Sequence, residues 1–237
     1  MLASRATMRG VPGDAARRRG LRRIFVPILC FGVLFGIGGG GVLGAAGLLH
    51  WSVGALLLLV AVGGFMYYCR QQPKLVYGYF KGARGEEMVA GELAHLPGEW
   101  TVFNGLLLPN GQDIDHVAIG PQGIFVVETK HWSGAVTIEA GQILANGRPI
   151  EKSPVQQVRH ALTAVAAELD CPAQTVQGVL CFVGNKFAEG PERADEILVC
   201  SHLSLVEALI HATPRLNASE IAQNVARMSR LQITEGL

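Results

Sequence analysis

The sequence is poor in charge and lacks the motifs of several common enzyme classes. Only 16% of its 237 residues are charged, whereas globular domains carry about 25%. Hydrophobic residues make up 49% of the chain, which excludes a disordered protein, and the 30 glycines follow no G-X-Y period, which excludes collagen. The motifs G-x-x-x-x-G-K-S/T, G-x-S-x-G and H-E-x-x-H do not occur, so neither a P-loop nor the commoner hydrolase and zinc-protease sites are indicated.

Cysteine is also scarce. The chain has five cysteines, an odd number, and no two of them have the C-x-x-C spacing of a metal or redox motif. They are Cys30, Cys69, Cys171, Cys181 and Cys200. This pattern argues against a disulfide framework and against a zinc site. We therefore expect buried, reduced cysteines.

Two long uncharged runs lie in the N-terminal third of the chain. Residues 24–49 contain no charged side chain, and residues 51–69 contain none either. Each run is close to the roughly 20 apolar residues that a helix needs to cross a bilayer. The sequence therefore predicts two transmembrane helices joined by a turn at residues 50–52. A cleaved signal peptide is the alternative, but its apolar core would be only about 7–15 residues long.

Basic residues flank this apolar region on both sides. Before the first run stand Arg17, Arg18, Arg19, Arg22 and Arg23, and after the second run stand Arg70 and Lys74. The turn between the runs has no basic residue apart from His50. Positive charge at both outer ends predicts that both termini are cytoplasmic. The chain thus divides into a basic cytoplasmic segment (1–23), a transmembrane hairpin (24–69) and a cytoplasmic domain (70–237), which predicts a multi-pass protein of the cytoplasmic membrane.

Glycines recur every four residues in the first run. They are Gly32, Gly36, Gly40 and Gly44. This spacing lines one helix face with small residues and lets another helix approach closely. The partner is either the second run of the same hairpin, which also contains glycines, or a second copy of the chain in a homo-oligomer.

Residues 70–237 have the pattern of an α/β domain. They carry 13 of the 20 Lys and Arg residues and 18 of the 19 Asp and Glu residues, so their net charge is −5. This sign disfavours strong non-specific binding of nucleic acid. Periodicity and turn residues predict a mixed sheet flanked by helices. The predicted elements are a helix at 85–96, strands at 100–108, 113–119 and 124–130, a hairpin at 135–145, a helix at 154–169, strands at 175–183 and 197–200, and helices at 204–211 and 218–231.

Two carboxylates and an ammonium group are predicted to meet at the end of one β-hairpin. With its turn centred between residues 121 and 122, paired residues have numbers that sum to 243, so Asp115 faces Glu128. Opposed side chains lie on the same face of a sheet, and Lys130 shares that face. Because opposed carboxylates repel, the pair indicates a divalent cation held between them, with Mg²⁺ usual in phosphate chemistry. A solvated strand face with a Glu–Lys pair is the alternative.

These residues carry a family resemblance. The stretch from Asp115 to Glu128-Thr129-Lys130 resembles the D…ExK signature of the restriction-endonuclease-like, or PD-(D/E)xK, superfamily. Four segments are more closely similar to the nuclease-related domain (NERD) family, in family order over about residues 80–185. They are 82–86 (GARGE), 113–117 (DIDHV), 123–134 (GIFVVETKHWSG) and 153–157 (SPVQQ). The family pattern at the last segment is N-P-x-x-Q, so Ser153 is a departure, although serine and asparagine both cap helices well.

The resemblance implies a restriction-endonuclease-like fold with a metal-dependent phosphodiesterase site. Asp115 and Glu128 would bind Mg²⁺ or Mn²⁺, and Lys130 would serve the nucleophile. Glu86 would reach the site from the first helix of the domain and Gln157 from the second. Glu87 is the substitute for Glu86 if the register differs by one residue. A glutamate in a first helical turn also suits the helix dipole without any catalytic role.

Three neighbouring aromatic residues are weaker candidates. His116 should point away from Asp115, since adjacent strand residues face opposite sides, and we expect it to pack against the first helix of the domain. His131 and Trp132 follow the site and are expected to pack on the sheet rather than to contact substrate.

The sequence therefore predicts a membrane-anchored nuclease that cuts DNA or RNA at the cytoplasmic face. The alternative is a membrane-tethered binding or scaffold module that keeps the nuclease fold without its activity. The intact Asp115, Glu128 and Lys130 favour the nuclease, whereas the net charge of the domain favours the scaffold.

Overall fold

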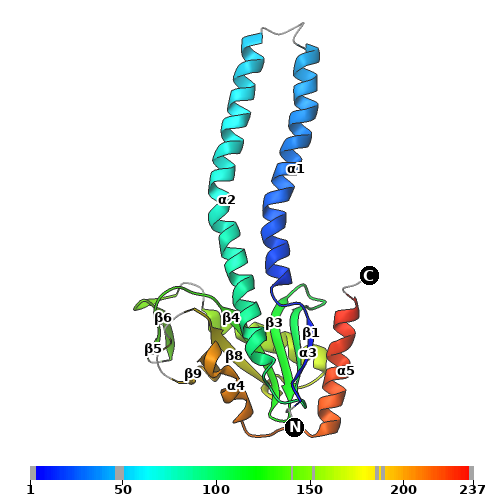
Figure 1. The fold of residues 1–237 in the computed structure, drawn as a ribbon, viewed down its shortest axis with the longest axis vertical. Coiled ribbons are helices and arrows are strands. Elements are labelled where there is room, and N and C mark those ends of the chain that lie inside the picture. The colour runs from blue at the N-terminus through cyan, green and yellow to red at the C-terminus, as the bar shows by residue number, and fades with distance from the viewer. Residues whose placement is uncertain are drawn as a thin grey trace. The chain divides into compact units, whose positions relative to one another are not determined.

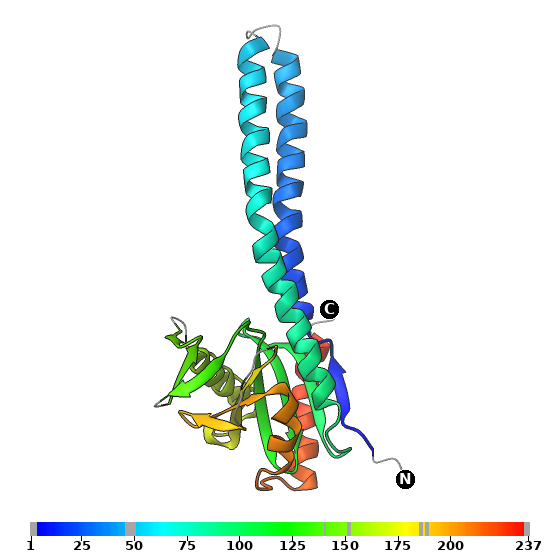
Figure 2. The ribbon, with the colours of Figure 1, turned by 60° about the vertical axis from the view of Figure 1, so that its left-hand side comes forward.

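The computed structural model describes residues 4–45, 51–139, 141–150, 153–184, 187 and 190–234. The chain divides into two compact units, one formed by Met1–Ala15 with Gly82–Leu237 and the other by Ala16–Lys81. The first unit is a domain of helices and strands, and the second is a pair of helices (Figure 1, Figure 2). The mixed α/β class predicted from the sequence is confirmed.

A seven-stranded mixed sheet forms the centre of the domain within the described residues, in the order β1-β2-β3-β4-β8-β10-β9. Consecutive strands β2, β3 and β4 are antiparallel, as tight connections require, whereas β4 and β8 are parallel because a long crossover joins them. A second, three-stranded sheet contains β5, β6 and β7. The strands are β1 (Thr7–Gly10), β2 (Thr101–Leu107), β3 (Asp113–Gly120), β4 (Gly123–Lys130), β5 (Val136–Glu139), β6 (Gln142–Ala145), β7 (Arg148–Pro149), β8 (Val176–Phe182), β9 (Glu192–Ala194) and β10 (Ile197–Ser201).

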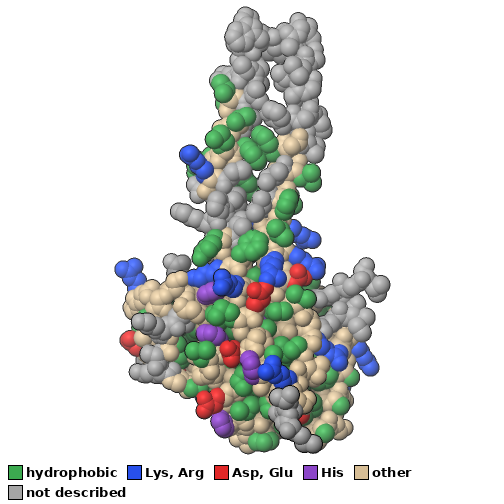
Figure 3. Space-filling model, viewed as in Figure 1, with side chains coloured by type: hydrophobic (Ala, Val, Ile, Leu, Met, Phe, Trp, Pro, Cys, Tyr) green, Lys and Arg blue, Asp and Glu red, His purple; other side chains and the backbone are tan. Residues whose placement is uncertain are grey.

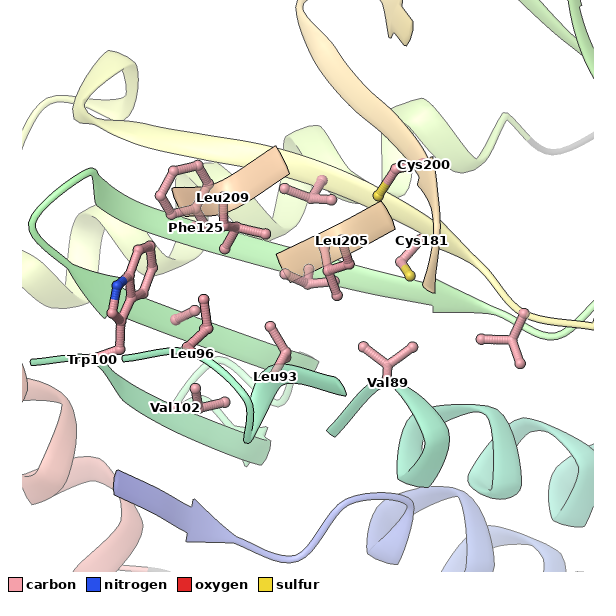
Figure 4. Packing of buried hydrophobic residues seen from close by; sticks show 14 residues of the cluster. Val89, Leu93, Leu96, Trp100, Val102, Phe125, Cys181, Cys200, Leu205 and Leu209 are labelled. Carbon is pink, nitrogen blue, oxygen red and sulfur yellow. The ribbon is translucent and has the colours of Figure 1, made fainter. Parts of the chain in front are cut away.

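Helices cover both faces of the seven-stranded sheet. The C-terminal end of α2 and helix α4 pack on one face, where Leu93 and Leu205 meet Phe125 of β4 in one buried cluster (Figure 4). Helices α3 and α5 pack on the other face, where Val165 and Met228 join the neighbouring strand residues. The helices are α1 (Asp14–Ala45), α2 (Trp51–Leu93), α3 (Pro154–Leu169), α4 (His202–Ile210) and α5 (Ala218–Thr234), with a short 3₁₀-helix at Ala173–Thr175.

Helix α3 begins where the sequence predicts it. Pro154 occupies the first turn, where its fixed φ suits a helix and its missing N–H costs no hydrogen bond. Ser153 stands at the N-cap position, but its side chain makes no capping hydrogen bond. Gln157 lies in the first turn of this helix.

The N-terminal segment differs from its prediction. The sequence division assigned residues 1–23 to a separate basic segment, but Thr7–Gly10 forms β1 and pairs in parallel with Thr101–Asn104 of β2. The side chains of β1 are exposed, so no alternation of apolar and polar residues marks the strand. The strand forms through main-chain pairing with β2, and main-chain pairing does not depend on residue type, so the sequence does not predict it.

The region predicted as a transmembrane hairpin contains two helices, both longer than predicted. Helix α2 continues without a break through residues 70–84, because helix propagation is cooperative and a single glycine costs only about 1 kcal/mol. Among the residues that the structure describes, no helix combines the length and apolar composition of a bilayer span. The two predicted transmembrane spans are thus not supported. The side chains of residues 33–58, which include most of the first predicted span, lie outside the described residues.

The two helices of the second unit run side by side (Figure 1, Figure 2). The rings of Phe31 and Phe65 stack with their centroids 4.2 Å apart, and the Tyr68 hydroxyl donates to the Arg23 carbonyl at 3.0 Å. Of the predicted glycine face, Gly32 has no atom of another described side chain within 4 Å of the position that a Cβ would take. The side-chain surroundings of Gly36, Gly40 and Gly44 lie outside the described residues, so the homo-oligomer stays a prediction.

Candidate active site

The β3–β4 hairpin has the predicted register. Its pairs run from Gly120 with Gly123 to His116 with Val127, and every pair sums to 243. The next position along the two strands brings Asp115 beside Glu128. The amide of Thr129, the residue after Glu128, donates a hydrogen bond of 2.8 Å to Asp115 Oδ2. The opposed carboxylates predicted from the turn thus lie at the same end of the hairpin.

Glu128 is the most buried member of the site and has two polar partners. Only 4% of the residue is exposed. Its Oε1 accepts a hydrogen bond of 2.6 Å from Lys130 Nζ and one of 2.5 Å from Gln157 Nε2. Lys130 Nζ also donates to Gln157 Oε1 at 2.8 Å. Each of the three side chains therefore contacts the other two, and the residues come from β4 and the first turn of α3.

Asp115 lies among like charges. Burial raises the pKa of its carboxyl group well above the ordinary value, and the carboxylates of Glu128 and then Glu86 raise it further. The Thr129 amide and the Lys130 ammonium act in the opposite direction. The charged form of Asp115 is thus destabilised by its surroundings, which is the electrostatic setting that a bound cation would relieve.

Glu86 reaches the same site from helix α2. It is partly buried, and its Oε2 accepts a hydrogen bond of 2.9 Å from the main-chain amide of Gly13. The influence of Glu86 on the pKa of Asp115 places the two carboxylates near each other. Glu87, the substitute considered from the sequence, has an exposed side chain. The structure therefore brings together all five predicted site residues: Glu86, Asp115, Glu128, Lys130 and Gln157.

The aromatic neighbours have structural positions. His116 is fully buried, and its Nδ1 lies 2.8 Å from Asn104 Oδ1. Burial lowers the pKa of His116 to about 3, so the ring is neutral at physiological pH. The ring of Trp132 packs on Phe182 with centroids 5.2 Å apart, and His131 lies against Gly85 of α2. Trp132 thus packs on the sheet as expected, whereas His131 lies against α2 instead. The polar contact of His116 is with Asn104 of β2, and its expected packing against the first helix of the domain stays a prediction.

Two contributions to the site were absent from the sequence prediction. The Thr129 amide holds Asp115, and the Gly13 amide holds Glu86. Both donors are main-chain N–H groups, which every residue except proline has, so the residue type does not predict them. The strand register could have identified Thr129, whereas nothing in the sequence points to Gly13, 73 positions before Glu86.

The donor set suits a hard divalent cation. Within the described ranges, no group of three or more His, Cys, Asp or Glu side chains is arranged to hold a metal ion. Mg²⁺, however, is usually bound through one or two carboxylates together with waters and substrate phosphate oxygens. Asp115 and Glu128 supply two such carboxylates, and the unfavourable charge on Asp115 fits a site for a cation.

Removing the charge of Asp115 should stabilise the metal-free protein. We expect Asp115→Asn to raise the free energy of unfolding in EDTA by about 1 kcal/mol, because the carboxamide keeps an oxygen for the Thr129 amide and ends the repulsion with Glu128 and Glu86. The folded-state pKa is raised, so the wild-type protein loses stability as pH rises above about 4, the unfolded value. The advantage of the variant should therefore grow with pH and level off above the folded pKa.

Thermal and denaturant unfolding at several pH values would measure this difference. Asp170→Asn is the matched control, because the Asp170 side chain is 92% exposed. A destabilised Asp115→Asn protein in EDTA would contradict the repulsion at the site.

One comparison with known proteins gives a match. Residues 81–183 match the nuclease-related domain (NERD) family. The match covers less than half of the chain and contains the residues that carry the resemblance in the sequence. No curated protein and no solved structure matches the chain. With Glu86, Asp115, Glu128, Lys130 and Gln157 all inside the matched range, the chain contains a nuclease-related domain at residues 81–183.

Proposed function

We propose that this protein is a divalent-metal-dependent nuclease that hydrolyses phosphodiester bonds of DNA or RNA, on a restriction-endonuclease-like fold held at the cytoplasmic face of the cytoplasmic membrane. The observation that carries the proposal is the convergence of Asp115, Glu128 and Lys130 at the end of one hairpin. A buried carboxylate paired with a lysine beside a second, disfavoured carboxylate is costly to the fold. Such a cost is typical of a functional site.

Each residue has a role that follows from its contacts. Asp115 and Glu128 would hold Mg²⁺ or Mn²⁺, which when bound supplies a Lewis acid for the phosphate and acidifies a water molecule. Lys130, whose side chain is 19% exposed, can present its ammonium group to solvent or substrate. There it would orient the attacking water and stabilise negative charge on the phosphoryl oxygens. Gln157 fixes the Lys130 ammonium through its amide oxygen.

The alternative function is a non-catalytic scaffold. The net charge of −5 on residues 70–237 favours it, since a duplex-binding enzyme would gain from the opposite sign. The Lys130 ammonium also compensates the negative charge of Glu128 without any metal. Under this alternative the site residues have no catalytic role, and the domain recruits a protein or nucleic-acid partner to the membrane.

The membrane anchor rests on the sequence of the hairpin and on its surface. Residues 24–49 and 51–69 carry no charge. Several apolar side chains of the described part are exposed, including Phe25 at 63%, Leu29 at 69% and Leu59 at 70%. Figure 3 shows hydrophobic side chains along the described surface of this hairpin. Exposed apolar surface of this extent indicates contact with lipid or with another protein.

One experiment tests the nuclease and its location together. The full chain is expressed, its membranes are washed at alkaline pH, and the protein is extracted in detergent. Labelled single-stranded DNA, duplex DNA and RNA are then incubated with it in Mg²⁺, Mn²⁺ or EDTA. We expect the protein to remain in the washed membranes and to cleave at least one substrate only with metal.

The control variant for this assay is Glu139→Ala, which removes an exposed glutamate of β5. Glu128→Ala should lose cleavage, and Glu139→Ala should keep it. Absence of metal-dependent cleavage from all three substrates would favour the scaffold. Release of the protein by the alkaline wash would refute the integral anchor without touching the enzymatic proposal.

A further inference from the structure

A glycine outside the matched domain contacts the proposed site. Gly13 lies between β1 and α1, and α1 begins at the next residue. Figure 1 shows the two elements that this loop joins. It is buried, and its main-chain amide donates a hydrogen bond of 2.9 Å to Glu86 Oε2. An amide that donates to an ionised carboxylate makes one of the stronger hydrogen bonds in a protein. Gly13 is therefore a direct partner of Glu86, whose carboxylate raises the pKa of Asp115.

The close approach of this loop to α2 requires glycine. Gly13 has a φ of +74°, in the left-handed region that other residues rarely adopt. A Cβ on Gly13 would lie 2.8 Å from Ala83 Cβ and 2.8 Å from the Ala83 carbonyl oxygen. Ala83 precedes Glu86 on α2 by three residues, so the loop touches the same helical turn twice. A larger residue would have to push the loop away from the helix.

The other side of the loop is fixed to the sheet. Asn104 Nδ2 donates to the Arg9 carbonyl at 3.0 Å, and the carbonyl oxygen of Val11 lies 2.7 Å from where a Cβ on Gly105 would stand. Asn104 also contacts the buried His116, the neighbour of Asp115. The loop is thus held between β2 and α2, and the position of its amide is set by packing on both sides.

A fixed amide restricts the Glu86 side chain. A glutamate that is free to rotate loses rotamer entropy when it is ordered against a ligand. A glutamate already held by a main-chain donor has lost that freedom on folding, so less is lost on binding. This is the preorganisation expected of a supporting shell around a metal site.

We propose that the main-chain amide of Gly13 is a positioning group that holds the Glu86 carboxylate toward Asp115, so that the loop leading into α1 is part of the nuclease site. The inference rests on the proposed metal-dependent activity.

The test uses the full chain in detergent and Mn²⁺ alone as the probe. Calorimetric titration gives the Mn²⁺ dissociation constant, and cleavage assays give the Mn²⁺ concentration at half-maximal rate. We expect Gly13→Ala to raise both values about tenfold, the effect of losing one charge-assisted hydrogen bond. The rate at saturating Mn²⁺ should stay within about threefold of wild type, because Asp115, Glu128 and Lys130 are untouched.

Gly111→Ala is the matched control. Gly111 has a φ of +82° and no atom within 4 Å of its Cβ position, so this variant carries the same backbone strain without a clash. In a Glu86→Gln background, Gly13→Ala should cause no further loss of Mn²⁺ affinity. Glu86→Asp, which keeps the charge but shortens the side chain, should weaken Mn²⁺ binding about as much as Gly13→Ala even if the latter folds poorly.

Three results would overturn the inference. The first is that Gly13→Ala binds Mn²⁺ as tightly as Gly111→Ala. The second is that Gly13→Ala still lowers the Mn²⁺ affinity by the same factor in the Glu86→Gln background. The third is that Glu86→Asp binds Mn²⁺ as tightly as wild type. Each would leave the nuclease proposal standing, because wild-type cleavage is measured in the same series. A wild-type protein that neither binds Mn²⁺ nor cleaves would overturn the proposed function and this inference together.

Discussion

Lys130→Met should reduce cleavage by about 10²–10³-fold, equivalent to ~3–4 kcal/mol of transition-state stabilisation. The ammonium group is the cationic side chain hydrogen-bonded to Glu128, at 2.6 Å, and Gln157 fixes it at 2.8 Å. Methionine fills a similar volume but offers neither charge nor donor. Steady-state rates at saturating metal would measure the loss, with Arg148→Met, an exposed position on β7, as control.

The same variant should also lower stability. Glu128 would stay buried and keep only Gln157 as a partner. Removing the cationic member of such a largely buried pair costs about 3 kcal/mol. The double variant Lys130→Met with Glu128→Gln should regain most of that stability, because no buried charge is left unpaired, yet it should stay inactive. This contrast separates catalysis from folding. Cleavage by Lys130→Met at the rate of the Arg148→Met control would contradict the assigned role.

The sequence was sufficient to predict the site where short-range rules determine geometry. The Gly120–Gly123 turn fixes the register of its two strands, and that register alone brings Asp115 beside Glu128. The period of a strand then places Lys130 on the same face, and the ion pair with Glu128 agrees. The predicted strands and helices of the domain likewise match β2 to β4, β8, α3 and α5 to within a few residues at each end.

The sequence was insufficient where long-range main-chain contacts decide. All four residues of β1 are exposed, and the strand exists through its pairing with β2, which follows it by more than 90 positions. The Gly13 amide reaches Glu86 across 73 positions. The sequence also predicts separate helices at 51–69 and 85–96, whereas α2 is continuous from Trp51 to Leu93. Once a helix has begun, each further residue adds a hydrogen bond, so the segment between the two predicted helices continues as helix.

Deletion of residues 2–10 should therefore destabilise the domain, although the matched range begins only at residue 81. The deletion removes β1, including the bonds from the Ala6 and Thr7 amides to the carbonyls of Leu96 and Trp100, at 2.9 and 3.0 Å. It also removes the Arg9 guanidinium, 5.7 Å from the centroid of the Phe103 ring. At about 1 kcal/mol net for each such bond, less the entropy of ordering the strand, the expected loss is about 3 kcal/mol.

Thermal unfolding and hydrogen exchange of the full chain would measure this loss. A destabilisation of that size should lower the Tm by about 10 °C. The amides of β2 should lose protection first, because β2 becomes the edge strand, while those of β10 at the far side of the sheet keep theirs until global unfolding. Met8→Ala is the control, since it alters an exposed side chain and keeps the main-chain pairing.

An unchanged Tm and unchanged exchange of β2 would show that β1 contributes nothing to the domain. The expected result has a consequence for any minimal nuclease fragment. Residues 81–183 lack β1 at one side and β10 and α4 at the other, and the buried cluster around Phe125 draws Cys200, Leu205 and Leu209 from those missing elements (Figure 4). Activity assays are therefore meaningful only on a chain that includes both flanking regions. A fragment without them would be inactive because its core is incomplete, even if all its site residues were present.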